Sequence, residues 1–318
     1  MRKFSRILYI CILLFLPLAA AAEELVPVGK LIGLQLVDDT VTVAAYDDAF
    51  GAAAREGGIK IGDQLVSING KPVTRARDVT DALEAGQPAR ITLRRSGRER
   101  TVTIQPAQPR DGPRLGILLR QGIAGVGTVT WYDPEEGTFG ALGHGVAGSR
   151  GALLQMTEGA AFDAAIRTIA RGKPGSPGQL KGVADANDLW GILTRNTPQG
   201  VFGRAQVPVT GTAIPTAAYE DITVGPAVIR STVTDRGPQD YSVEILKIYP
   251  QSRGDGRNLL LKVTAPALLD ITGGIVQGMS GSPIIQDGKL VGAVTHVLVN
   301  DPTTGYGIFI ENMLDAAG

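Results

Sequence analysis

The stretch Gly278-Met279-Ser280-Gly281-Ser282-Pro283 places a serine between two glycines, just before a small residue and a proline. Glycine permits backbone angles that other residues avoid, and it lets a substrate come close. Such a turn is typical of a serine nucleophile, with the backbone N–H groups of Gly278, Met279 and Ser280 forming an oxyanion hole. The alternative is an ordinary Gly/Ser turn, in which these hydroxyls only support the backbone. Ser282 is the weaker nucleophile candidate, because the next strand begins at Pro283.

A serine nucleophile needs a base, and the chain has two histidines, His144 and His296. His144 lies between two glycines at the end of an expected hairpin. It precedes Ser280, which fits an arrangement in which one β-barrel supplies the base and the next supplies the nucleophile. A structural, hydrogen-bonded histidine is the alternative at this position. His296 lies on an apolar strand. It is interpreted as a core histidine, or as one that contacts the catalytic residues without contacting the substrate.

The composition predicts a mainly β chain without a metal site or cofactor. With 318 residues there is room for two domains with separate cores. The 42 glycines and 19 prolines, with few long helical patterns, favour strands and turns. Lys+Arg and Asp+Glu both number 31, which argues against nucleic acid as a partner. The single cysteine, Cys11, and two histidines far apart in sequence offer no cluster of metal ligands.

Residues 1–24 have the pattern of a signal peptide or an uncleaved membrane anchor. Arg2, Lys3 and Arg6 precede an uncharged apolar run from Ile7 to Ala22, in which Ala20-Ala21-Ala22 offers a small-residue cleavage site. This order predicts that the remaining chain is exported. The run is short for a membrane-spanning helix.

Residues 25–105 are predicted to form a small α+β domain. The stretch from Ala53 to Val73 (AAREGGIKIGDQLVSINGKPV) resembles a PDZ domain. PDZ domains bind an extended peptide or a C-terminus by adding a strand to a sheet edge. The resemblance implies peptide binding at the loop that holds Val28, Gly29, Leu31, Ile32 and Gly33, whose amides would hold a carboxylate. A domain that only packs against its neighbour is the alternative.

A second domain is predicted from residue 115 to residue 318. The stretch 106–114 is rich in proline and is predicted to be the linker between the two domains. Short apolar runs separated by glycines, without a long amphipathic helix, suit the strands of a barrel. The run after the serine motif predicts a hairpin with its turn at Asp287-Gly288.

Three stretches of this second domain resemble the SpoIVB peptidases, which are sporulation serine peptidases of endospore-forming bacteria. They are Gly125 to Pro134 (GVGTVTWYDP), Phe139 to Val146 (FGALGHGV) and the run from Gly273 to Pro302 that contains the serine motif. The order of apolar segment, PDZ domain and peptidase domain is also that of the family. The resemblance implies a trypsin-like double β-barrel, with His144 as the catalytic histidine and Ser280 as the nucleophile.

The resemblance also implies a biological role. Members of the family are exported from the forespore and act between its membrane and that of the mother cell. There they cleave a membrane-bound regulator, which releases an intramembrane protease that activates a late mother-cell sigma factor, and they tend to process themselves. The implied partners are a membrane-bound regulatory protein, a peptide at the PDZ domain, and the membrane at the N-terminal segment.

The third member of the catalytic triad departs from the family pattern. The family has an aspartate before the serine, in a V-T-D-P motif, where this chain has Val263-Thr264-Ala265-Pro266. An orienting carboxylate can be worth about 10⁴ in rate. In the first alternative another carboxylate substitutes, with Asp270 nearest in sequence and Asp185 and Asp188 as further candidates. In the second a slower Ser–His dyad acts alone, and in the third the peptidase is inactive.

Three functions fit these residues. The first is an exported serine endopeptidase of the sporulation signalling cascade. The second is a PDZ peptide-binding regulator with a weak or inactive peptidase domain, which Ala265 favours. The third is a general periplasmic quality-control protease, which is disfavoured because such proteases usually carry the PDZ domain after the peptidase.

Overall fold

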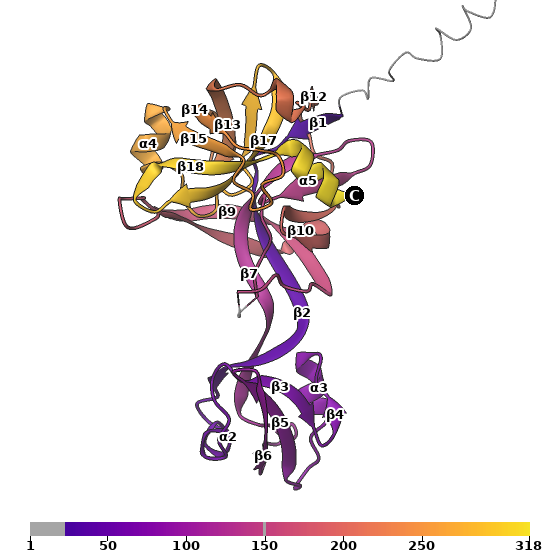
Figure 1. Ribbon diagram of the computed structural model, residues 1–318. Helices are drawn as coiled ribbons and strands as arrows, with labels where there is room; N and C mark the ends of the chain where they lie inside the picture. Colours follow the sequence, from indigo (N-terminus) through magenta and orange to yellow (C-terminus); the bar gives the residue numbers. More distant parts are fainter. Residues whose placement is uncertain (1–22, 149–150) are drawn as a thin grey trace, which may run out of the picture.

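The computed structural model describes residues 23–148 and 151–318, so nearly all of the expected signal segment lies outside the described residues. Strands dominate the chain, and the mainly β class expected from the sequence is confirmed. No helix among the described residues is both long and apolar enough to span a bilayer. Figure 1 shows a large upper body and a smaller lower domain, which β2 and β7 connect as a two-stranded ribbon.

The upper body contains most of the strands, which differ widely in length, and two of the α-helices. In chain order they are β1 (Glu24–Pro27), β2 (Leu31–Tyr46), β7 (Ile117–Tyr132), β8 (Thr138–Ala141), β9 (Glu158–Ala170), β10 (Gln179–Thr197), β11 (Gly200–Ala205), β12 (Ile214–Pro215), the 3-10 helix η2 (Tyr219–Asp221), β13 (Gly225–Thr232), β14 (Pro238–Ile248), β15 (Leu259–Val263), α4 (Pro266–Thr272), β16 (Pro283–Gln286), β17 (Lys289–Leu298), β18 (Asp301–Phe309) and α5 (Ile310–Ala317). The lower domain adds α2 (Ala52–Glu56), β3 (Gln64–Ile68), β4 (Lys71–Pro72), α3 (Ala76–Asp81), β5 (Ala89–Arg95) and β6 (Arg98–Ile104).

The first barrel of the upper body is a ring of antiparallel strands. Strand β2 pairs with β7, β7 with β8, β8 with β11, β11 with β10, β10 with β9, and β9 again with β2. Its interior is apolar, and Phe139 packs edge-on against Trp190 with ring centroids 4.7 Å apart. This barrel carries His144, which follows β8.

The second barrel is closed by β13, β14, β15, β18, β17 and β16, in that order. Its core is a cluster of buried aliphatic side chains that includes Ile229, Leu261 and Val294. The expected hairpin with its turn at Asp287-Gly288 is formed by β16 and β17. Ser280 lies in the loop that leads from α4 into β16.

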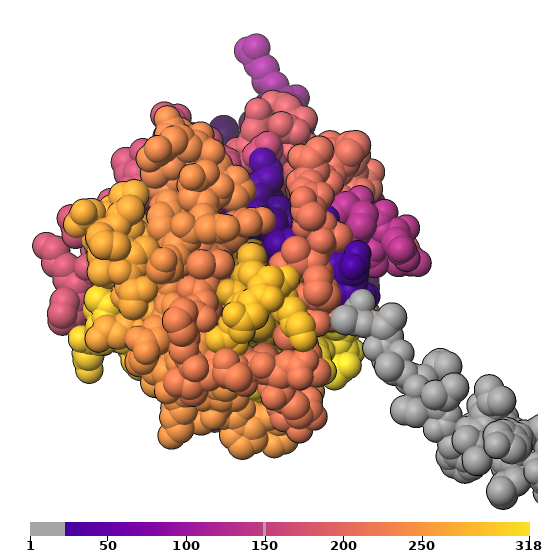
Figure 2. All heavy atoms as spheres, turned by 90° about the horizontal axis from the view of Figure 1, so that it is seen from above, coloured from indigo at the N-terminus to yellow at the C-terminus, as the bar shows by residue number. Residues whose placement is uncertain are grey.

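Strand β1 lies between the two barrels. It pairs with β7 of the first barrel and with the short strand β12. The segment after it is fixed to the second barrel, because Thr232 donates its hydroxyl to the Gly29 carbonyl at 2.8 Å and Arg230 donates to the Pro27 carbonyl at 3.2 Å. Figure 2, seen from above, shows these indigo residues lying between the orange second barrel and the magenta part of the first. The N-terminal strand therefore helps to hold the barrels together.

The PDZ domain is inserted into the first barrel. Val41 to Tyr46 of β2 pair with Ile117 to Gln121 of β7, and β3, β5 and β6 extend this sheet. The domain has its own core, in which Ile59 and Leu65 are buried. Both ends of the insertion leave through one ribbon, where Leu36 and Ile123 are the last register partners before the irregularity that leads into the PDZ sheet.

This topology differs from the expected boundaries at residues 25–105 and 106–114. Residues 24–37 belong to the peptidase body through their pairing with β7, β9 and β12. The proline-rich stretch 106–114 is a loop of the PDZ domain, closed by two hydrogen bonds between the backbones of Ala107 and Arg114 (2.8 and 2.9 Å). The sequence could not predict these boundaries, because an apolar strand has the same pattern in either domain. Only its pairing with strands far away in sequence shows to which domain it belongs.

Candidate active site

Ser280 lies in a loop whose backbone angles favour glycine on both sides of it. Gly278 and Gly281 have φ angles of +99° and +96°, which residues with a side chain rarely adopt. A Cβ on Gly281 would overlap the backbone oxygen of Thr128. The loop is closed on the other side by the amide of Gly281, which donates to the Val294 carbonyl at 2.7 Å. The glycines quoted from the sequence are therefore required by the shape of the turn.

Strand β7 of the first barrel fixes the same loop through Thr128, a residue that the sequence analysis did not single out. The amide of Thr128 donates to the Ser280 carbonyl at 3.0 Å, and its hydroxyl donates to the Gly278 carbonyl at 2.8 Å. The side chain is fully buried. Thr128 therefore ties the nucleophile of one barrel to a strand of the other.

His144 enters the site from a tight turn after β8. Leu142 and Gly143 have φ angles of +70° and +68°, so two successive residues are left-handed. A Cβ on Gly143 would lie 2.9 Å from Cγ2 of Thr295, which leaves little room for a side chain there. The amide of Leu142 donates to the Thr128 carbonyl at 3.2 Å. Thr128 thus contacts both the turn before His144 and the loop of Ser280.

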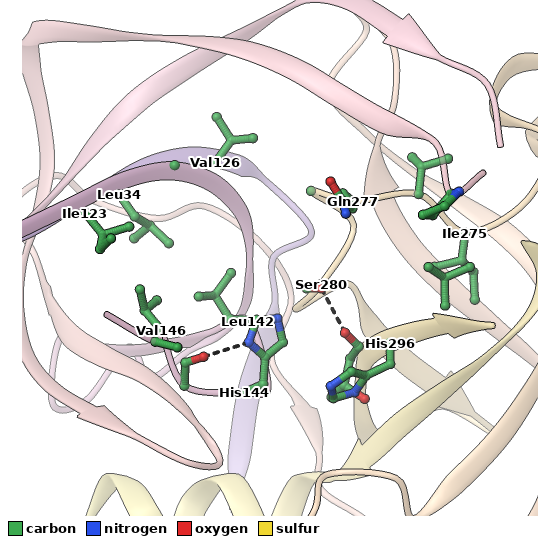
Figure 3. A pocket seen from close by; sticks show the side chains of 18 of the residues that line it. Leu34, Ile123, Val126, Leu142, His144, Val146, Ile275, Gln277, Ser280 and His296 are labelled. Atoms are coloured by element: carbon green, nitrogen blue, oxygen red, sulfur yellow. Dashed lines mark hydrogen bonds between the residues drawn. The ribbon is translucent and has the colours of Figure 1, made fainter. Parts of the chain in front are cut away.

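Ser280, His144 and His296 line one cavity (Figure 3). The hydroxyl of Ser280 donates to the Thr295 carbonyl at 2.9 Å. The two imidazole rings have centroids 5.6 Å apart and are tilted by 42°. The structure therefore brings together the predicted nucleophile, the predicted base and the second histidine, with the serine proton directed at a backbone carbonyl in this state.

The partner of His144 is a backbone carbonyl. Its Nδ1 lies 3.0 Å from the Gly145 oxygen. Because a carbonyl can only accept, Nδ1 must carry the proton and Nε2 is then free to act as a base. A neutral carbonyl fixes the tautomer, as the aspartate of a triad does, but it gives less stabilisation to an imidazolium than a carboxylate would.

The proposed carboxylates lie elsewhere. Asp270 is exposed on α4, Asp185 and Asp188 are exposed on β10, and none of them lines the cavity of His144. Ala265 is the N-cap residue of α4 and packs in the core of the second barrel. The structure thus does not bring Asp270 to His144, and it places position 265 at a helix terminus.

The amides near Ser280 divide into two kinds. Met279 donates its N–H to the Val276 carbonyl at 3.1 Å, so this amide is not available to a substrate and does not belong to the expected oxyanion hole. Within the part of the chain that the structure describes, the amides of Gly278 and Ser280 donate to no protein acceptor. These two N–H groups remain as oxyanion donors.

His296 lies on β17, next to Thr295, whose carbonyl accepts the hydrogen bond from the Ser280 hydroxyl. Burial, and then the nearby charge of His144, lower the pKa of His296 to about 4. Its Nδ1 is buried, and among the described residues it has no hydrogen-bond partner. At neutral pH this ring is therefore uncharged. No group of three His, Cys, Asp or Glu side chains in the described residues is placed to hold a metal ion.

The expected peptide-binding loop requires a correction. The amides of Val28 and Gly29 donate to Thr130 and Val129 of the first barrel. Strand β2, which begins at Leu31, pairs through Ile32 and Gly33 with β7 on one side and β9 on the other. These residues have no free edge, so a peptide cannot add a strand to them.

One strand of the PDZ domain, the start of β7, is paired on one side only among the described residues. The start of β7, Ile117 to Gln121, pairs with β2 on one side, and α3 lies against it. Gly116 comes just before this strand and has a φ angle of +70°. The Gln121 side chain accepts from the Ala76 amide at 3.2 Å and so connects the strand to the first residue of α3. The stretch Leu115-Gly116-Ile117 could have predicted this strand. It was not assigned to the PDZ domain because it follows the expected linker at 106–114.

A comparison with family models finds two matches. The family described as SpoIVB peptidase S55 matches residues 111–314, and a PDZ domain family matches residues 48–95. Among curated proteins, the zinc metalloprotease RasP of Geobacillus kaustophilus is 33% identical over 69 residues, which are 21% of this chain and 16% of that protein. A probable periplasmic serine endoprotease, DegP-like, of Pseudomonas fluorescens is 29% identical over 121 residues, 35% of this chain and 25% of that protein. The matches thus span a quarter or less of these two relatives.

Solved structures with partial similarity are also proteases. The active form of the Rv3671c protease from M. tuberculosis has a TM-score of 0.38 and 15% identity, covering 62% of this chain and 75% of that one. The HtrA-type protease AlgW with a tripeptide has a TM-score of 0.37 and 13% identity, covering 60% of this chain and 54% of that one.

Proposed function

Because the chain belongs to the SpoIVB S55 peptidase family, whose model matches residues 111–314, we propose that it is a serine endopeptidase with Ser280 as nucleophile and His144 as general base. The observation that carries the proposal is the shared cavity of these two side chains, which come from different barrels. The glycine-dependent loop of Ser280 supports it, because the loop keeps two amides free beside the hydroxyl.

The chemistry follows from the atoms in place. The Ser280 hydroxyl leaves the Thr295 carbonyl and gives its proton to Nε2 of His144 while Oγ adds to the scissile carbonyl carbon. The resulting oxyanion accepts hydrogen bonds from the amides of Gly278 and Ser280. Nε2–H then protonates the leaving amine, and the C–N bond breaks to leave an acyl-enzyme. Water then gives a proton to the same Nε2 while its oxygen adds to the acyl carbon; the ester bond to Oγ breaks, Nε2–H returns its proton to Oγ, and the acid leaves.

Covalent labelling with a fluorophosphonate tests this function. We expect the wild-type protein to be labelled, and Ser280→Ala to abolish and His144→Ala to strongly reduce the labelling. Ser282→Ala is the matched control in the same loop, because the Ser282 hydroxyl is buried and donates to Ser231 at 2.9 Å. Labelling that persists in Ser280→Ala, or that Ser282→Ala removes, contradicts the proposal.

A second function is favoured by one observation, namely that His144 Nδ1 contacts a neutral carbonyl. Without a carboxylate the imidazolium is less stable in the transition state, at a cost of up to about 10⁴ in rate. A PDZ regulator that binds peptides and cleaves weakly or not at all is the corresponding alternative. Peptide binding at the edge of β7, in a folded wild-type protein that is not labelled, would favour it.

For the biological role we propose an exported peptidase of the sporulation signalling cascade. In this role it cleaves a membrane-bound regulator of an intramembrane protease between the forespore and mother-cell membranes, and it also trims its own N-terminal region. The family membership and the charged and apolar pattern of residues 1–24 support this proposal. The test is expression in an endospore-forming host that lacks its own family member. Restored activity of a late sigma-factor reporter by the wild type, but not by Ser280→Ala, is expected. A labelled protein that fails to restore the reporter contradicts the role and leaves the peptidase assignment intact.

A further inference from the structure

The cavity that holds Ser280 and His144 is large and almost entirely aliphatic. It has a volume of about 540 Å³ and opens to solvent. Its apolar lining consists of Leu34, Leu36, Ile123, Val126, Leu142, Val146, Ala147, Pro177, Ile275, Val276, Val297 and Val299. These residues come from both barrels and from the loop that precedes the nucleophile, so the cavity surrounds the reacting hydroxyl.

Charge is absent from this lining. Among the described residues, no Asp, Glu, Lys or Arg side chain lines the cavity. The polar side chains there are Gln277, Thr295, Ser280 and the two histidines. A charged substrate side chain would lose its hydration in this space without a partner, which costs several kcal/mol. An apolar side chain would gain about 25 cal/mol for each Å² that it removes from water.

The apolar lining lies beside Ser280, and this position determines which side chains of a substrate would occupy the cavity. Ile275 to Gly278 come shortly before Ser280, and Val297 and Val299 come shortly after Thr295, whose carbonyl accepts a hydrogen bond from the Ser280 hydroxyl. A scissile carbonyl placed at Ser280 therefore carries its neighbouring side chains into this cavity. The volume lies within the range of typical ligand pockets, about 300–1,000 Å³, and leaves room for the side chains on both sides of the scissile bond.

We propose that the substrates of this site are extended polypeptide segments with large aliphatic or aromatic residues flanking the scissile bond, and that charged residues are excluded there. The proposal rests on the proposed peptidase function, since it assigns the substrate class of the same site. It assigns specificity to the aliphatic lining, above all to Val126 on β7 and to the half-exposed Val299 after β17.

Binding to a catalytically inert variant tests the preference without cleavage. Labelled octapeptides that differ only in their two central residues, Leu-Leu, Lys-Lys or Asp-Asp, are titrated into full-length Ser280→Ala and followed by fluorescence anisotropy. Their ends are acetylated and amidated, so that no free C-terminus binds at the PDZ domain. We expect the Leu-Leu peptide to bind at least about tenfold more tightly than the others, which corresponds to about 1.4 kcal/mol.

A matched pair of variants locates the effect. Val299 and Val183 are both valines with 50% exposed surface, but only Val299 lines the cavity. In the Ser280→Ala background, Val299→Asp should improve Lys-Lys binding relative to Leu-Leu by about tenfold, and Val183→Asp should leave the ratio unchanged. Val126→Asp gives a second carboxylate on another wall, with circular dichroism to check its fold.

Two outcomes overturn the proposal: equal or tighter binding of the charged peptides, or no measurable binding of any peptide. Fluorophosphonate labelling of the wild type is recorded separately. A preference for Leu-Leu in a protein whose wild type is never labelled supports the apolar site and refutes the peptidase function, so the two failures are distinguishable.

Discussion

The hydroxyl of Thr128 donates to the carbonyl of Gly278 at 2.8 Å and thereby links β7, the strand that continues into the PDZ domain, to the loop that holds Ser280. The neighbouring Thr130 is equally buried, but within the described residues its hydroxyl has no hydrogen-bond partner. The two threonine hydroxyls, on one strand, therefore differ in that only the hydroxyl of Thr128 has a hydrogen-bond partner.

We predict that Thr128→Val lowers the free energy of unfolding by about 1 kcal/mol, because the half-buried Gly278 carbonyl loses its donor. Thr130→Val should be neutral or stabilising, because it removes a buried hydroxyl that has no partner. Urea denaturation of both variants measures the difference. The fluorophosphonate labelling rate should fall in Thr128→Val alone, and an equal loss of stability in both variants contradicts the role of this hydrogen bond.

Position 265 allows a test of the missing aspartate. Ala265 is the N-cap of α4 and provides no side-chain cap. Ala265→Asp adds a helix cap worth about 1 kcal/mol, but position 265 is buried, so burying the carboxylate offsets this gain; the labelling rate should not change. Ala265→Asn is the control, since it caps as well but has no charge. Faster labelling with Asp and not with Asn would show that the carboxylate reaches His144.

His296 makes the stability of the protein dependent on pH. Its pKa is lowered to about 4 in the folded state, first by burial and then by His144. The unfolded chain, with a pKa near 6.5, binds a proton first as the pH falls, so stability is lost between about pH 6.5 and 4. The expected loss is about 1–2 kcal/mol, allowing for the partial exposure of the ring. Comparing His296→Gln with the wild type at pH 7 and pH 4.5 measures this loss. A wild type that loses no more stability than the variant contradicts the prediction.

Gly281 and Gly288 form a second matched pair. Both have positive φ angles, +96° and +75°, but only at Gly281 would a Cβ meet backbone atoms, those of Thr128 and Leu142. Gly288→Ala should therefore cost only about 1 kcal/mol of backbone strain. Gly281→Ala should cost more and abolish labelling, since the serine loop must move. Circular dichroism separates a displaced loop from an unfolded chain, and similar effects of the two changes would refute this explanation.

Local features of the chain predicted much of this arrangement. The glycines around Ser280 and before His144 mark backbone angles that only glycine adopts readily, so they are visible in a single sequence. The predicted fold class and family are both confirmed. They could be predicted because turns, alternating strands and a specific motif are local patterns in the sequence.

What could not be predicted depends on contacts between distant residues. Thr128 has no motif of its own, and its role appears only when two barrels meet. The PDZ resemblance implies a peptide-binding loop from Val28 to Gly33, yet β7 and β9 occupy both edges of Ile32 and Gly33. The sequence motif predicts the Met279 amide as an oxyanion donor, but in the folded chain this amide donates to the Val276 carbonyl. Pairing partners of this kind are set by tertiary structure and leave no local signal.

The insertion of the PDZ domain also sets the order in which the chain can assemble. Strand β2 is synthesised before the PDZ residues, but its partners β7 and β9 emerge only after them. The PDZ core can collapse as soon as its own residues are available, whereas the first part of β2 must wait as an unpaired apolar strand. Until then the edges of residues Leu31 to Leu36 are open to aggregation or to a chaperone, and they are covered only when β7 and β9 have been made.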